Sequence, residues 1–104
     1  MCHPVVVKID DINIDKGNRE KLQKHGVSLE EIIEFFSAEF YVLRDEGHSE
    51  KESRFIGFSE VRGRSIFVAF TIRTKNGKLV FRPISARFAH KREVEKLYEK
   101  INRE

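Results

Sequence analysis

Arginine side chains in the second half of the chain are the residues best suited to chemistry, because a planar guanidinium can hold a phosphate group through two hydrogen bonds. Residues 54–104 contain 13 Lys and Arg, eight of them Arg, but only 5 Asp and Glu, a net charge of +8. Residues 1–53 contain 7 basic and 12 acidic residues, a net charge of −5. The basic half therefore favours a polyanionic partner such as nucleic acid. The alternative is that these charges only solvate strands and a helix.

The spacing around two turns predicts how some of these arginines are arranged. Asn76-Gly77 is typical of a two-residue β-hairpin turn, and Arg62-Gly63 fits a second one. In the resulting register Thr71 lies opposite both Arg54 and Arg82, so the three side chains share one face of a sheet. Clustered cations repel each other, and an anion from RNA or from an acidic partner would stabilise them.

The opposite face of the same hairpins is expected to form a core covered by helices. Its apolar residues are Phe55, Val61, Ile66, Val68, Phe70, Ile72, Leu79 and Phe81. Pro83 cannot donate a hydrogen bond to a neighbouring strand, so a β-bulge is expected near it. A bulge reverses the facing of every residue beyond it, which leaves the side chosen by Ser85 and Arg87 open.

The elements that position these residues indicate one α+β domain, residues 1–104, in the order β-α-α-β-β-β-β-α. We expect a small antiparallel sheet with helices on one face. The predicted strands are residues 5–9, 40–43, 54–61, 64–73 and 79–88, with a polar loop at 44–53. One helix is predicted over residues 16–25, capped by Asp15. A second starts at Ser28, which forms a capping box with Glu31, and a third contains Val94, Leu97, Tyr98 and Ile101 at helical spacing.

Several classes of protein are disfavoured by composition. Apolar residues make up 39% of the chain and charged residues 36%, which is too hydrophobic for a disordered protein. Cys2 is the single cysteine, so a disulfide framework is excluded and a reduced, cytoplasmic location is expected. We expect no metal site and no cofactor, because the chain lacks His pairs at helical ligand spacing and a glycine-rich phosphate loop.

An ordered set of motifs resembles the BrnT toxin family. Lys24-His25-Gly26-Val27-Ser28 is similar to that family's KHGVS segment. It is followed by His48, Glu52-x-Arg54, Gly63-Arg64, Phe67-Val68, Thr71-x-Arg73, Arg82-x-Ile84-Ser85-Ala86-Arg87-x-Ala89, Glu93 and Tyr98. The resemblance extends from about Ile12 to the C-terminus.

The resemblance implies a fold, an activity and a partner. It implies a RelE-like fold and a toxin of a type II toxin–antitoxin system that acts as a ribonuclease and inhibits translation. It also implies a BrnA-like ribbon-helix-helix antitoxin, which would bind the toxin and carry operator DNA. RNA would be the substrate, and no membrane is expected to be involved.

RNA cleavage without a metal needs a base, an acid and cations that stabilise charge on the phosphate. The candidate catalytic residues are Arg54, Arg82, Arg87, Glu52 and His48. The candidate RNA-binding residues are Lys24, Arg64, Thr71, Arg73 and Ser85. For His25 a role at a helix C-terminus is the favoured interpretation.

The sequence is compatible with two functions. The first is a metal-independent endoribonuclease of the mRNA interferase type, which cleaves RNA through attack by the ribose 2′-hydroxyl. The second is a non-catalytic module that binds nucleic acid or an antitoxin through the same basic face. Cleavage of RNA in the presence of EDTA would separate the two.

Overall fold

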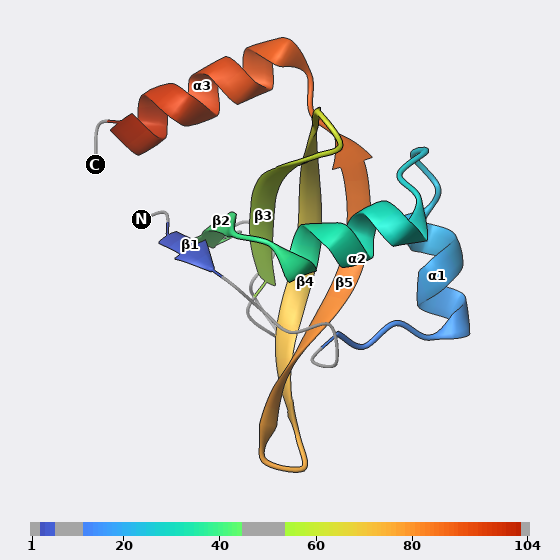
Figure 1. Cartoon of the computed structure of the whole chain (residues 1–104). Helices are drawn as coiled ribbons and strands as arrows, with labels where there is room; N and C mark the ends of the chain where they lie inside the picture. Colours follow the sequence, from blue (N-terminus) through green and yellow to red (C-terminus); the bar gives the residue numbers. More distant parts are fainter. Residues whose placement is uncertain (1–2, 6–11, 45–53, 103–104) are drawn as a thin grey trace.

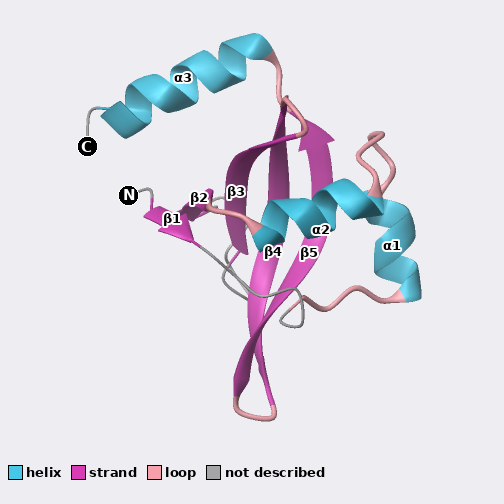
Figure 2. Ribbon diagram, viewed as in Figure 1, coloured by secondary structure: helices cyan, strands magenta, loops and turns pink. Residues whose placement is uncertain are grey.

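The computed structural model describes residues 3–5, 12–44 and 54–102 of the chain. The elements are β1 (His3–Val5), α1 (Lys16–Leu22), α2 (Leu29–Ser37), β2 (Phe40–Arg44), β3 (Arg54–Val61), β4 (Arg64–Lys75), β5 (Lys78–Phe88) and α3 (Lys91–Asn102). The strands form one antiparallel sheet in the order β1-β2-β3-β4-β5 (Figures 1 and 2). The predicted α+β class and antiparallel sheet are therefore confirmed. The polar loop expected at 44–53 lies outside the described residues except for Arg44, which ends β2.

Two tight turns fix the register of β3, β4 and β5. Arg62 and Gly63 have φ angles of 52° and 78°, and Asn76 and Gly77 have φ angles of 54° and 77°. Both residues of each turn thus have positive φ, as a type I′ turn requires. Arg54 pairs with Thr71, and Thr71 pairs with Arg82, so the predicted register is confirmed.

A β-bulge interrupts the pairing of β4 with β5, close to the proline where the sequence predicts one. Phe70 pairs with Pro83 but Ala69 pairs with Ser85, so Ile84 is the extra residue. Beyond the bulge Arg87 pairs with Phe67. Because alternate residues of a strand share a face, Ser85 and Arg87 lie on the same side as Thr71. We call this side, with Arg54, Thr71, Arg82, Ser85 and Arg87, the arginine face.

The other side of the sheet, the core face, packs against α1 and α2. The phenylalanines of α2 are fully buried, and the Phe36 ring lies edge-on to Phe70 of β4 with centroids 5.5 Å apart. Phe70 in turn stacks on Phe81 of β5 at 5.3 Å. Figure 1 shows α2 crossing in front of the central strands and α1 beside it. The core therefore lies between this helical layer and the core face.

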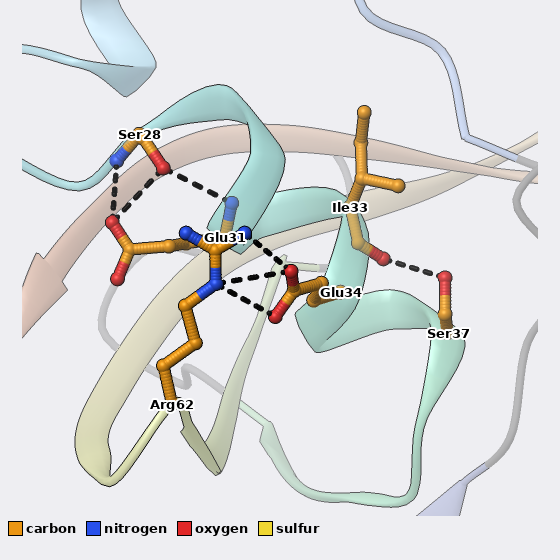
Figure 3. Close-up of polar contacts among 6 residues, drawn as sticks. All are labelled: Ser28, Glu31, Ile33, Glu34, Ser37 and Arg62. Carbon is orange, nitrogen blue, oxygen red and sulfur yellow. Dashed lines mark hydrogen bonds and ion pairs between the residues drawn. The ribbon is translucent and has the colours of Figure 1, made fainter.

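Polar contacts cap helix α2 at its start and tie it to a neighbouring turn (Figure 3). At its start the Ser28 hydroxyl accepts a hydrogen bond from the Glu31 N–H at 3.1 Å, and the Glu31 carboxylate accepts one from the Ser28 N–H at 3.1 Å. The predicted capping box is thus confirmed. Farther along, Glu34 accepts hydrogen bonds from Arg62, which ties the helix to the turn between β3 and β4.

Helix α3 contradicts the prediction that all helices pack on one face. Phe58 of β3 points to the arginine side of the sheet, because its position alternates with that of Gly57 on the core face. Its ring lies edge-on to Tyr98 of α3, with centroids 5.9 Å apart. Leu97 is also buried. In Figure 1 α3 accordingly lies at one end of the sheet, apart from α1 and α2. Helix α3 packs on this side because the arginine side also carries apolar residues, and the helix shields them from water.

Candidate functional site

The centre of the arginine face is a row formed by Arg54, Thr71 and Arg82 from three neighbouring strands. Adjacent strands are about 4.8 Å apart, so the two arginines flank the threonine in neighbouring positions of the sheet. Thr71 is 1% exposed, and its hydroxyl oxygen makes no hydrogen bond within residues 3–5, 12–44 and 54–102. Such a buried hydroxyl is an unsatisfied polar group in the middle of a cationic row.

Arg82 is held in place by the start of α1. Its Nη1 donates a hydrogen bond to Asp15 Oδ2 at 3.1 Å, while Asp15 Oδ1 accepts the N–H of Asn18 at 2.8 Å and caps the helix. The Asn18 N–H and the Arg82 guanidinium together lower the pKa of Asp15. The mutual repulsion expected for the arginines is therefore reduced by a carboxylate of the chain itself, 67 residues away in the sequence.

Arg87 is oriented by α3. Its Nη1 and Nη2 donate to the two carboxylate oxygens of Glu93 at 2.8 and 2.6 Å, and its guanidinium carbon lies 5.0 Å from the centroid of the Phe67 ring. Glu93 also accepts the N–H of His90 at 3.0 Å. Hydrogen bonds from Arg87 and His90 lower the pKa of Glu93 to about 2. A carboxylate with so low a pKa is a weak general base at neutral pH, so Glu93 is a positioning residue for Arg87.

A pocket of about 550 Å³ opens between the arginine face and α3. Its polar residues are His25, Ser85, Arg87, Glu93 and Lys96, and its apolar residues are Leu43, Ile56, Phe67, Ala69, Ala86 and Leu97. Thus β2, β3, β4 and β5 supply the floor and α3 supplies one wall. The pocket adjoins the cationic row along β4, because Ala69 and Thr71 are successive residues of the same face.

His25 and Lys96 also line the pocket, and neither is among the site residues predicted from the sequence. Helix α1 ends at Leu22 rather than at residue 25, so His25 lies in the following turn and lines the pocket. A helix-end role was the favoured interpretation for this histidine, and it stays a prediction, with His25 three residues beyond the end of α1. Lys96 comes close to the sheet only because α3 folds over the arginine side.

The remaining predicted site residues are dispersed. Lys24 is exposed in the turn after α1, whereas Arg73 lies on the same side of the sheet as Thr71, two residues nearer the hairpin turn. Arg64 lies outside the arginine face, with its guanidinium carbon 3.4 Å from the centroid of the Phe88 ring. His48 and Glu52 lie outside the described residues. Among the described residues no group of three or more His, Cys, Asp and Glu side chains could hold a metal ion.

Comparison with protein families identifies a relationship over most of the chain. Residues 14–93 match the family described as "Ribonuclease toxin, BrnT, of type II toxin-antitoxin system". The chain belongs to this family. The BrnT match runs from just before α1 to the first turn of α3, so it includes the arginine face and the Glu93 contact. The suspected resemblance to BrnT toxins is therefore confirmed.

A search of curated proteins gives no match. In the described part of the chain, no helix has the length and apolar character needed to cross a membrane.

Proposed function

We propose that this BrnT toxin is an endoribonuclease that binds RNA phosphates on the arginine face and cleaves the chain without a metal ion. The observation that carries the proposal is the row of Arg54, Thr71 and Arg82, continued by Ser85 and Arg87 beyond the bulge. Two of these arginines are pre-oriented by carboxylates, and positioned donors stabilise a transition state better than mobile ones.

The proposed reaction is an internal transesterification. The ribose 2′-oxygen attacks the adjacent phosphorus and loses its proton to a base, while the 5′-oxygen leaves and takes a proton from an acid. The products are an RNA ending in a 2′,3′-cyclic phosphate and an RNA with a free 5′-hydroxyl. Arg54 and Arg82 would stabilise the negative charge that builds on the phosphate oxygens.

Three residues are proposed as candidates for the acid and the base. One is His25, and the others are His48 and Glu52 from the segment that precedes β3 in the sequence. His25 lines the pocket beside the row, and histidine is the side-chain type that most readily exchanges protons near neutral pH. His48 and Glu52 remain candidates from the sequence. Glu93 is not proposed as the base, because its pKa of about 2 keeps it a weakly basic anion.

The cellular role is proposed from the family. We infer a RelE-like fold, inhibition of translation through cleavage of mRNA in the cytoplasm, and neutralisation by a BrnA-like ribbon-helix-helix antitoxin that also binds operator DNA. The type II family description supports an antitoxin partner and an RNA target in general terms.

Incubation of the purified full-length chain with end-labelled RNA in EDTA tests the proposed activity. We expect fragments that carry a 2′,3′-cyclic phosphate. Tight RNA binding without cleavage would instead support a non-catalytic module that uses the same face. Cleavage that needs added Mg²⁺ would refute the metal-independent reaction.

A further inference from the structure

The pocket beside the cationic row has the size and lining of a binding site for a small planar group. Its volume of about 550 Å³ falls within the range of about 300–1,000 Å³ that is typical of small-molecule sites. Ile56, Phe67 and Ala69 form an apolar floor, and Leu97 of α3 is part of the wall. The described structure leaves this apolar floor open, in contrast to the tightly filled core face.

Arg87 supplies a flat surface in this pocket. Its two Nη atoms are bound to Glu93, and one side of the guanidinium lies over Phe67, so the plane cannot turn freely. The Arg87 side chain is nevertheless 46% exposed and lines the pocket. Proteins that read single-stranded RNA stack bases on aromatic rings or on arginine planes of this kind.

The position of the pocket suits a base that is attached to a bound phosphate. Ala69 of the floor and Thr71 of the row are two residues apart on β4, a separation of about 7 Å. A chain whose phosphate lies on the row therefore passes the pocket within one nucleotide. Lys96 on α3 and the arginines of the row add positive charge on two sides, which complements the RNA backbone.

We infer that this pocket takes one unstacked nucleobase next to the bond that is cleaved, an inference that rests on the proposed ribonuclease function. The base stacks against Arg87 and Phe67, while the Ser85 hydroxyl and His25 lie within the same pocket to contact its edge. A base inside a duplex is stacked and paired, so the substrate class is single-stranded RNA. One position beside the cleaved bond determines the sequence preference.

The test compares one single-stranded RNA with versions of it that each lack a single base. The cleaved bond is first mapped with the full-length wild-type chain in EDTA, and each flanking nucleotide is then replaced by an abasic ribose. Removal of the base at one flanking position should slow cleavage about tenfold, as expected from the loss of one stacked base. Removal of the base at positions farther away should have little effect.

A pocket-filling variant gives an independent readout. Ala69→Met extends a side chain into the pocket, and Ala38→Met is the matched control, because Ala38 is exposed at the end of α2. Ala69→Met should cleave the intact and the abasic RNA at equal rates, whereas Ala38→Met should keep the wild-type difference.

The outcomes separate this inference from the proposed function. Equal wild-type rates on intact and abasic RNA at every flanking position would overturn the base pocket and leave the ribonuclease activity standing. A folded Ala69→Met variant that keeps the wild-type difference between intact and abasic RNA would also overturn it, because a side chain that fills the pocket would then leave recognition of the base unchanged. A wild-type chain that cleaves no RNA would overturn the proposed function and the base pocket together. If Ala69→Met does not fold, the wild-type comparison decides alone.

Discussion

Replacement of Arg82 by alanine tests whether the arginine face stabilises the transition state of RNA cleavage. Asp15 holds the Arg82 guanidinium through the Nη1 contact of 3.1 Å, and the side chain remains 26% exposed. The group is thus oriented before RNA arrives, while part of it stays accessible to a phosphate. A donor that is oriented in this way stabilises the transition state, in which negative charge has built up on the phosphate oxygens, more than it stabilises the ground state.

The expected size follows from the loss of one such donor. Removal of a preorganised donor typically raises the barrier by about 2–4 kcal/mol, which corresponds to a rate about 30- to 1,000-fold lower. RNA affinity should fall much less, because other cations still bind the backbone. Arg82→Lys should restore only part of the rate, since a point charge cannot reproduce the planar donor fork.

The assay combines single-turnover cleavage, RNA binding and thermal unfolding on the same variants. Arg62→Ala is the matched control, because it also removes an exposed arginine that is paired with a carboxylate, but on the side of the sheet covered by α2. The melting temperature of Arg82→Ala should stay close to that of the wild type, since the Asp15 carboxylate in the lost pair is largely exposed. A folded Arg82→Ala variant that cleaves RNA as fast as Arg62→Ala would refute the reasoning.

Four further predictions concern stability and binding. Glu93→Gln should lower the free energy of unfolding at pH 7 by about 1 kcal/mol, after the value of about 3 kcal/mol implied by its pKa of about 2 is discounted for solvent exposure. Because the folded-state pKa is depressed below 4.5, this stabilisation should disappear as the pH falls from about 5 to 2, and a difference between wild type and Glu93→Gln in thermal melts that stays constant over this range would contradict it. Gly57→Ala should lower stability in urea by about 1–3 kcal/mol, since its Cβ would lie 2.9 Å from Phe35 Cζ, and unchanged stability would contradict the packing. Ser28→Ala should lower it by about 1 kcal/mol through loss of the cap of α2, measured in the same way. RNA affinity should fall steeply between low and high salt in a binding titration, and salt-independent binding would count against phosphate contacts on the arginine face.

The sequence by itself determined the hairpin register and therefore the cationic row. Asn76-Gly77 and Arg62-Gly63 specify tight turns through their own backbone preferences, and each turn sets the pairing of every residue that follows until a bulge. The bulge beside Pro83 is local in the same sense, because a proline cannot donate to the ladder. The capping box of α2 involves residues only three apart. Such features depend on residues that are close together in the sequence, so the sequence alone is enough to predict them.

Only the tertiary structure decided what surrounds that row. Arg82 and Asp15 are 67 residues apart, so their contact depends on how α1 packs against β5. The predicted placement of all helices on one face was wrong because both faces of the sheet carry apolar residues, and the pattern of α3 fits either face. Its packing on the arginine side created the pocket and brought in Lys96, while Glu93 fixed Arg87. Periodicity shows that a helix has an apolar side, but the free energy of packing the whole chain selects which surface that side covers.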